Sequence, residues 1–373
     1  MKLNKRANDS TRQLGLQVNK KEGEMALRLL RDIGLLERKL RIQSSGNRLV
    51  IPLSRRPLPT QQKALSEKLH DFSLSESDFQ SRPTSRQTLA EELAGKLPEG
   101  LLEILPESLD IIGDIVVVES PEEFKDHEKT LAAGILTVNR NARVVLAKTG
   151  AVSGRERIRP VRFLAGEERT TSIHRESGCR FKVDLAKAYF SPRLSHEHQR
   201  IVKLVESGER IVDMFAGVGP FSIMIAKKLS DVEVDAIDVN LEAVKLMKEN
   251  IELNKPRGVL RVWHGDAKDV VRKHLSGIAT RVIMNHPSDS TEFIPAACGA
   301  LVPEGGIVHY YAFAEGPDCE VIATNELVQG LANCGWKLEQ LLGTRKVREV
   351  APMRWQVVVD VKIALEGTHE SRC

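Results

Sequence analysis

The C-terminal half of the chain alternates between two hydrophobic patterns. Short apolar runs such as RIVDMF (210–215), VEVDAIDV (232–239) and VLRVWHG (259–265) are separated by longer amphipathic segments such as LEAVKLMKENIELN (241–254). The short runs indicate buried strands, and apolar positions at helical spacing indicate helices. Strands that alternate with helices are typical of an α/β fold with a doubly wound, mostly parallel sheet, which we predict for residues 189–373.

Two smaller α/β patterns precede this sheet. In residues 1–56, LGLQVN, KLRIQ and RLVIPL predict strands, and KKEGEMALRLLRDIGLL predicts an amphipathic helix that ends near Gly34. Residues 57–87 are rich in Pro, Ser, Gln and charged residues, a composition typical of a flexible linker. Residues 88–188 hold a strong apolar run, LDIIGDIVVVES, a helical segment, FKDHEKTLAAGIL, and further strand candidates. The pattern therefore predicts three domains, 1–56, 88–188 and 189–373, with one linker.

Charge is unevenly distributed between these domains. The net charge is only +4, but residues 1–56 contain fourteen Lys or Arg and five Asp or Glu. A basic module favours a polyanionic partner such as nucleic acid, because its cations release condensed counterions when they meet phosphates. A solubilising surface is the alternative interpretation.

Other bulk features narrow the class of protein. No apolar run approaches the roughly 20 residues of a membrane helix, and the N-terminus lacks a signal peptide pattern. The five cysteines are scattered without a C-x-x-C pair, which implies neither zinc nor a disulfide framework. We therefore expect a cytoplasmic monomer with no membrane partner.

A glycine turn follows the first strand of the large sheet. RIVDMFAGVGPFS carries Asp213, Phe215, Gly217 and Gly219 between a strand and a helix. Glycines let the backbone approach a ligand, and such junctions lie at the carboxyl edge of the sheet, where α/β folds bind ligands. Neither G-x-G-x-x-G nor a Walker lysine is present, which weakens pyrophosphate and ATP interpretations.

The next two strands each end in an acid. Asp238, followed by Val239, can accept both hydroxyls of a ribose, and Asp266, followed by Ala267, could accept from an adenine amino group. Each acid alone could be a helix cap. Together with the glycine turn they resemble the S-adenosylmethionine site of class I methyltransferases, which implies that cofactor and a seven-stranded, Rossmann-like sheet.

The fourth strand, RVIM (281–284), runs into Asn285, His286 and Pro287. A proline cannot continue a central strand, so the chain must turn there. A capped loop is one interpretation. The other is a pocket for a flat base, because an amide both donates and accepts and proline holds the turn rigid. Class I enzymes that methylate base nitrogens often carry Asn-x-Pro at this position, which would place Asn285 against the cofactor as well.

Four ordered motifs carry a closer resemblance. YFSPRLSHEHQR (189–200), DMFAGVGPFSI, VIMNHPSDSTEF and RKVREVAPMRWQVVVDV (345–361) look together like the archaeal and eukaryotic tRNA (guanine-37-N1)-methyltransferases. KKEGEMALRLLRDIGLLERKLRI resembles the small first domain of that family. The resemblance implies methyl transfer to N1 of guanosine 37 in tRNA. Residues 1–56 would then dock the tRNA, and residues 88–188 would recognise RNA.

The resemblance also implies three catalytic roles. Glu197 matches the general base that takes the N1 proton, Arg157 the arginine that steadies charge on O6, and Asn285 the residue that holds the base edge. The chemistry is coherent, since removal of a weakly acidic proton builds charge toward O6, which a guanidinium stabilises. Without the resemblance, Glu197 could be a structural acid at a helix start, and Arg157 part of a solvated basic face.

The remaining predicted site residues are expected to lie around these catalytic groups. We expect Arg193 and His198 near the methionine end of the cofactor, and Tyr189, Pro287 and Arg159 around the base. Ordinary core packing is the alternative for Tyr189. No metal is expected, because the adjacent His196, Glu197 and His198 point in different directions on a helix.

Two positions depart from the family pattern. His286 stands where the family usually has Leu, and Val350 replaces the tyrosine of V-R-x-Y-A-P.

The nearest alternative function is the related aminocarboxypropyl transfer of wyosine-type tRNA modification, although that family typically lacks Asn-x-Pro. A dual guanosine and wyosine-precursor methyltransferase and a non-catalytic tRNA-binding protein are further alternatives.

Overall fold

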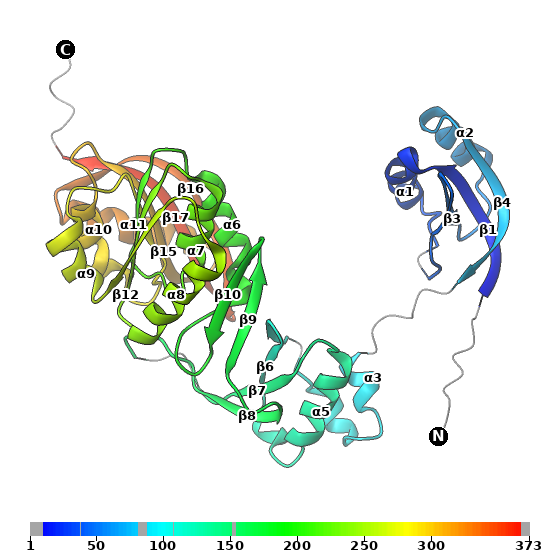
Figure 1. Ribbon diagram of the computed structural model, residues 1–373, viewed down its shortest axis with the longest axis horizontal. Coiled ribbons are helices and arrows are strands. Elements are labelled where there is room, and N and C mark those ends of the chain that lie inside the picture. Colours follow the sequence, from blue (N-terminus) through cyan, green and yellow to red (C-terminus); the bar gives the residue numbers. More distant parts are fainter. Residues whose placement is uncertain (1–9, 38, 81–87, 107, 151–153, 367–373) are drawn as a thin grey trace. The chain divides into compact units, whose positions relative to one another are not determined.

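The computed structural model describes residues 10–37, 39–80, 88–106, 108–150 and 154–366 (Figure 1). The chain divides into two compact units between Glu92 and Leu93. The first unit is an antiparallel sheet in the order β2-β3-β1-β4. Residues of β1, α1 and α2 share its core: Leu16, Val18, Ala26, Leu30 and Leu65. Its elements are β1 (Ser10–Asn19), η1 (Lys20–Glu22), α1 (Gly23–Asp32), β2 (Gln43–Ser45), β3 (Arg48–Pro52), α2 (Pro59–Lys68) and β4 (Phe72–Gln80).

The expected linker over residues 57–87 is wrong for most of its length. Residues 59–68 form α2, and β4 pairs antiparallel with β1 from Ser10↔Gln80 to Val18↔Phe72. Composition misled because β4, FSLSESDFQ, is an edge strand with small and polar residues at most positions, yet it buries Phe79 fully. Residues 81–87 lie outside the described part. The predicted strand KLRIQ is also largely wrong, since β2 covers only Gln43–Ser45.

The second unit begins with a four-stranded sheet in the order β5-β6-β7-β8. The apolar run LDIIGDIVVVES forms the hairpin of β5 and β6 rather than one strand. Gly113 turns the chain there with a φ of +61°, and a Cβ would lie 2.6 Å from the carbonyl oxygen of Ile173. Helix α3 (Leu89–Leu93) spans the boundary between the units. The elements that follow it are α4 (Glu99–Glu103), β5 (Asp110–Ile112), β6 (Ile115–Glu119), η2 (Glu122–Phe124), α5 (Glu128–Val138), β7 (Val144–Lys148) and β8 (Val161–Gly166).

The predicted doubly wound sheet is confirmed. Seven strands lie in the order β13-β12-β11-β14-β15-β17-β16, and only the pairings that involve β17 are antiparallel. Because the first four strands run parallel, their carboxyl ends share one edge of the sheet. The strands are β11 (Arg210–Asp213), β12 (Glu233–Asp238), β13 (Val259–His264), β14 (Arg281–Met284), β15 (Gly306–Glu315), β16 (Trp336–Ala351) and β17 (Arg354–Leu365).

Helices and short turns connect these strands. They are η3 (Pro192–Leu194), α6 (Ser195–Leu204), α7 (Pro220–Lys228), α8 (Leu241–Asn254), α9 (Ala267–Val270), η4 (Val271–Leu275), η5 (Ser290–Phe293), α10 (Ile294–Ala300) and α11 (Cys319–Ala332). No helix within the described ranges is long and apolar enough to cross a membrane.

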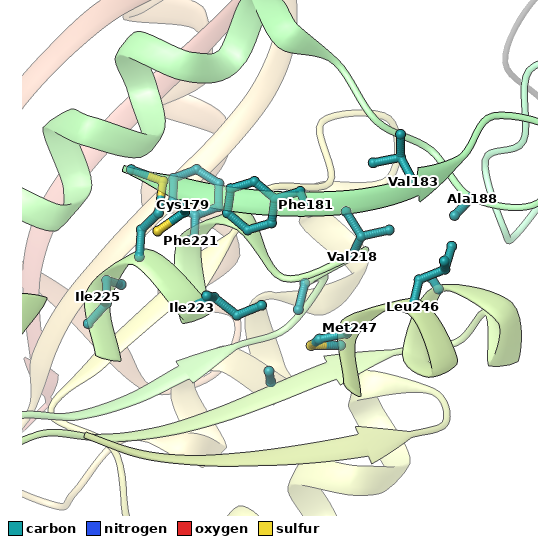
Figure 2. Packing of buried hydrophobic residues seen from close by; sticks show 14 of the residues in the cluster. Cys179, Phe181, Val183, Ala188, Val218, Phe221, Ile223, Ile225, Leu246 and Met247 are labelled. Atoms are coloured by element: carbon teal, nitrogen blue, oxygen red, sulfur yellow. The ribbon is translucent and has the colours of Figure 1, made fainter. Parts of the chain in front are cut away.

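A hairpin of β9 (Thr171–Glu176) and β10 (Cys179–Asp184) packs onto the outer face of the helices. Figure 2 shows Cys179, Phe181 and Val183 of β10 in the same apolar cluster as side chains of α7 and α8. Two asparagines of α8 hydrogen-bond the backbone of β10. Asn250 accepts from the Lys182 nitrogen at 2.6 Å and donates to the Lys182 carbonyl at 3.0 Å, and Asn254 makes the same pair of bonds with Arg180 at 2.9 and 2.6 Å.

Candidate active site

A cleft of about 720 Å³ opens at the carboxyl ends of β11 to β14. Residues 154–157 and the segment that leads into α6 form its other walls. Most predicted site residues line it: Arg157, Tyr189, His198, Phe215, Gly217, Asp238, Val239, Asp266, Ala267, Asn285 and Pro287. Five do not line it: Arg159, Arg193, Glu197, Asp213 and Gly219.

The glycine turn after β11 is tied to the acid that ends β12. The Gly217 nitrogen donates to Oδ2 of Asp238 at 2.7 Å, and the Asn240 nitrogen donates to Oδ1 at 2.8 Å. Gly217 and Gly219 have φ values of +57° and +90°, which favour glycine. A Cβ on Gly219 would also lie 2.9 Å from the Met247 side chain. The turn therefore presents a fixed carboxylate to the cleft.

Asp213 supports this turn from below. Its side chain is fully buried, its Oδ2 accepts from the Ser222 hydroxyl at 2.7 Å, and its Oδ1 has no partner. Burial raises the pKa of Asp213 to about 7. Asp213 therefore supports the turn from a buried position and does not line the cleft.

Asp266 is engaged within the protein. Its Oδ1 accepts from the Lys268 nitrogen at 2.8 Å and caps α9. Its Oδ2 forms an ion pair with Arg155, on the segment 154–157. A bound adenine would have to share or replace this arginine if it donates to Asp266.

Aromatic rings line the cleft between β11 and η5. His286 lies edge-on to Phe215 at 4.7 Å between ring centroids and is stacked near Phe293 at 5.7 Å. Burial, followed by the positive charge of Arg157, lowers the pKa of His286. Its Nδ1 is buried without a hydrogen-bond partner. His286 is therefore a neutral, aromatic part of the wall with one unsatisfied nitrogen.

Asn285 is held by residues that the sequence reasoning missed. Gln356 of β17 donates from Nε2 to Oδ1 of Asn285 at 3.1 Å and accepts from Nε of Arg348 at 2.9 Å. Arg348 also donates to the hydroxyls of Ser191 and Tyr189, at 3.0 and 2.9 Å. The amide Nδ2 of Asn285 is left to donate into the cleft. Both missed residues lie in the C-terminal motif RKVREVAPMRWQVVVDV, which carried the resemblance without assigned roles.

Arg157, on the segment 154–157, lines the same cleft as Asn285. It occupies the left-handed backbone region with a φ of +52°, uncommon for a residue with a side chain. Its Nη1 donates to the Ser288 hydroxyl at 2.5 Å. Burial lowers the pKa of Arg157, but a guanidinium remains charged at neutral pH. A partly buried cation thus lies beside the turn after β14.

Glu197 lies behind the cleft wall. Its side chain is 2% exposed, and its carboxylate accepts from Arg200 and, at 2.6 Å, from the Tyr311 hydroxyl. The cleft is lined instead by its neighbours on the chain, Leu194 and His198. His198 Nδ1 bonds Oε1 of Glu176 at 2.8 Å.

Arg159 and Arg193 line a second, smaller cavity of about 170 Å³. Arg193 donates to Asp110 at 2.6 Å, so its guanidinium points away from the cleft. Lys148 also pairs with Asp110, at 2.9 Å. Tyr189 lines both cavities, which therefore share a wall.

Three protein-family models match the chain. They are the TRM5/TYW2 methyltransferase domain over residues 172–333, the TYW2 N-terminal domain over 89–170 and the tRNA methyltransferase 5 N-terminal domain over 15–58. The tRNA (guanine(37)-N(1))-methyltransferase Trm5b of Pyrococcus abyssi is 37% identical, covering 94% of this chain and 99% of that protein. Its crystal structure gives a TM-score of 0.68 at 34% identity and covers 95% of this chain and 100% of its own.

Two further comparisons bear on the substrate. A solved complex of aTrm5 with tRNALeu gives a TM-score of 0.64 at 32% identity, covering 94% of this chain and 99% of that one. A tRNA(Phe) (4-demethylwyosine(37)-C(7)) aminocarboxypropyltransferase from Pyrococcus horikoshii is 30% identical, covering 76% of this chain and 97% of that protein.

Proposed function

Because this chain belongs to the TRM5/TYW2 methyltransferase family, we propose that it transfers a methyl group from S-adenosylmethionine to N1 of guanosine 37 in tRNA. One observation carries the proposal. The Asn285 amide and the Arg157 guanidinium line the same cleft as the Gly217–Asp238 turn. A base held by the first pair would therefore lie beside a cofactor held by the second.

The residues of the cleft fit S-adenosylmethionine. Asp238 keeps acceptor capacity for ribose hydroxyls, because within the described residues each of its oxygens accepts a single hydrogen bond, from a backbone nitrogen. Phe215 and Ala267 offer apolar surface for an adenine. A cleft of about 720 Å³ falls in the usual range for cofactor sites and leaves room for a base. The cofactor supplies a methyl group on a positively charged sulfur.

The protein groups would act on the acceptor base. Arg157 would stabilise the negative charge that builds on O6 as the N1 proton leaves. Asn285, whose carbonyl oxygen is fixed by Gln356, would donate to the base edge and hold the ring for attack. Glu197 would accept the N1 proton. From its present position its side chain must turn past Leu194 and His198 to reach the cleft.

Cations outside the cleft would hold the rest of the RNA. Arg159 lies in the second cavity, next to the Tyr189 wall, where a phosphate flanking the target nucleotide would pass. The first unit would dock elsewhere on the tRNA through its basic residues. We also propose that the enzyme acts as a monomer. Removing residues 1–80 should raise the KM for tRNA about tenfold and leave kcat within about twofold, whereas a comparable fall in kcat would contradict a docking role.

Aminocarboxypropyl transfer is the second candidate. The relative named for it covers 76% of this chain. The TYW2 N-terminal model matches residues 89–170, and the TRM5/TYW2 methyltransferase model matches residues 172–333. The tRNA methyltransferase 5 N-terminal model, over residues 15–58, favours methyl transfer instead.

Mass spectrometry of the product separates these functions. Incubation with S-adenosylmethionine and an unmodified tRNA that carries guanosine 37 should give N1-methylguanosine, and a tRNA with adenosine 37 should give none. An aminocarboxypropyl product, or no product, would contradict the proposal.

Glu197→Gln tests the assigned base. The single-turnover rate should fall about 100-fold or more, because general bases contribute at least that much, while cofactor affinity changes less than about twofold. Glu249→Gln is the matched control, since Glu249 is an exposed acid of α8 that forms an ion pair with Lys182. An unchanged rate in Glu197→Gln would remove Glu197 as the base.

A further inference from the structure

A chain of buried polar groups runs from Glu197 across three strands of the large sheet. Arg200, one turn along α6, donates from Nε and Nη2 to the Glu197 carboxylate at 2.7 to 3.1 Å. Its Nη1 donates to Oδ2 of Asp360, on β17, at 2.5 Å. Oδ1 of Asp360 bonds Nδ1 of His309, on β15, at 2.5 Å. Nε2 of His309 bonds Nη1 of Arg281, on β14, at 2.7 Å.

These contacts determine the protonation of His309. An arginine has no acceptor, so Arg281 donates and Nε2 of His309 carries no proton. Nδ1 therefore carries the proton and donates to Asp360, and the imidazole is neutral. Burial lowers the pKa of His309, which agrees with this assignment. His309 thus fixes the orientation of Asp360 without adding a charge.

Charges alternate along the rest of the chain. Burial lowers the pKa of Arg200, but the hydrogen bonds to Glu197 and Asp360 outweigh burial and raise it. Burial raises the pKa of Asp360, but its hydrogen bonds to His309 and Arg200 outweigh burial and lower it. Arg200 is therefore a permanent cation between two carboxylates, and it interrupts any proton path because a guanidinium does not give up its proton.

We propose that Arg200 is a positioning residue for the reaction. It holds the Glu197 carboxylate behind the cleft wall, in the position from which the side chain turns toward the cleft, and Asp360 offsets part of the charge of Arg200. This inference rests on the proposed role of Glu197 as the base. According to this inference, two residues outside the cleft, Arg200 and Asp360, set the pH below which the rate of methyl transfer falls.

Three other groups face Glu197 or lie next to it. Tyr311 of β15 donates its hydroxyl, and burial raises the pKa of Tyr311 well above its usual value, so it stays protonated. Arg345 of β16 lies 3.9 Å away and is 47% exposed, so solvent screens it. His198, the next residue on α6, is turned toward Glu176 of β9.

The test is the single-turnover rate of methyl transfer as a function of pH, at saturating cofactor and tRNA. Arg200→Gln removes the cation that contacts the Glu197 carboxylate. The acid limb of the profile should therefore move to higher pH by about one unit or more. Asp360→Asn removes the anion that offsets Arg200, so the limb should move to lower pH. Shifts of the acid limb in opposite directions for the two variants would indicate an effect of charge, because a loss of structure would not move the limb in opposite directions.

Two variants complete the experiment. Arg200→Lys keeps the charge and should bring the limb back toward that of the wild type. Arg272→Gln removes an exposed arginine paired with Asp269 at the same i,i+3 spacing, and should leave the profile unchanged. If Arg200→Gln does not fold, as judged by lost cofactor binding, Asp360→Asn and Arg200→Lys carry the test.

Three outcomes would overturn the inference: a uniform loss of rate in Arg200→Gln with the limb in place, shifts of Arg200→Gln and Asp360→Asn in one direction, or an unmoved limb in Asp360→Asn. Failure of the proposed function is distinguishable. In that case the wild-type protein makes no N1-methylguanosine, or Glu197→Gln keeps the wild-type rate.

Discussion

The proposed cofactor end and the proposed acceptor end of the cleft are built in different ways. At the cofactor end, the glycine turn and Asp238 follow directly from neighbouring parallel strands, and backbone nitrogens hold the carboxylate. At the acceptor end, each group depends on a distant residue. Asn285 is held by Gln356 and Arg157 by Ser288, with separations of 71 and 131 residues. The cofactor end is thus a property of local strand–turn–helix structure, whereas the acceptor end requires the complete fold.

The largest effect is predicted for a substitution that changes only the acceptor end. Asn285→Ala should lower the single-turnover rate about 100- to 1,000-fold, the effect expected when a preorganised amide donor is lost. The cofactor dissociation constant should change less than about threefold. Rapid-quench kinetics and calorimetry give the two values.

Gln356→Leu is the intermediate variant for this prediction. It keeps the Asn285 amide but releases its carbonyl oxygen, so the rate should fall about tenfold, as expected for loss of a positioning hydrogen bond of roughly 1.4 kcal/mol. Equal rates for Gln356→Leu and the wild type would show that strand β14 alone orients Asn285.

The next prediction concerns a substitution at the cofactor end. Asp238→Asn places an amide NH2 opposite one of the two backbone nitrogens that now donate to the carboxylate. The cofactor dissociation constant should rise about 10- to 100-fold, since hydrogen bonds to charged groups contribute roughly 1.5–3 kcal/mol. The rate at saturating cofactor should stay within about threefold. Asp231→Asn, which changes an exposed acid, is the control. A large fall in the rate at saturating cofactor would show that Asp238 affects methyl transfer as well as cofactor binding.

The same contrast explains what the sequence could predict. Strand RVIM and helix LEAVKLMKENIELN were predicted with the bounds that the structure gives, because each has a clear hydrophobic period. Asp238 and Gly217 were placed in the cleft because parallel strands end at one edge. The burial of Glu197 against Arg200 could not be predicted, since it depends on Asp360 and Tyr311 from strands more than 100 residues away.

Edge elements were also beyond the sequence reasoning. Strand β4 alternates apolar and polar residues only over Phe72–Ser75 and is mostly polar after that, so it resembled a linker until its pairing with β1 was known. The hairpin strand β10 is completed by Asn250 and Asn254, whose side chains replace a neighbouring strand. Neither arrangement leaves a periodic pattern in the sequence.

A smaller effect is predicted for Asp213, beneath the cofactor end. Its folded pKa of about 7 lies above its unfolded value of about 3.9. Protonated Asp213 therefore stabilises the fold fully below about pH 4, and this contribution is lost as pH rises through about 7. Asp213→Asn should remove this slope and raise the free energy of unfolding at pH 8 by about 1–3 kcal/mol.

Urea unfolding from pH 5 to pH 8 checks this prediction. All three tryptophans, Trp263, Trp336 and Trp355, lie in the second unit, so their fluorescence reports on that unit. An Asp213→Asn protein with the wild-type pH slope would show that Asp213 is already ionised in the folded state. Asp231→Asn again serves as the exposed control.

The smallest effect is expected where the two ends meet, at His286. Its lowered pKa keeps it neutral at pH 7, and its Nδ1 has no partner. His286→Leu therefore removes no charge and no hydrogen bond that the protein makes through Nδ1. The methyl-transfer rate should stay within about threefold, with a parallel pH profile between pH 6.5 and 8. Stability should rise by about 1 kcal/mol, because an unsatisfied buried polar atom is lost. A rate that falls tenfold or more would show instead that Nδ1 bonds the substrate or cofactor, and would make this histidine the polar link between the two ends of the cleft.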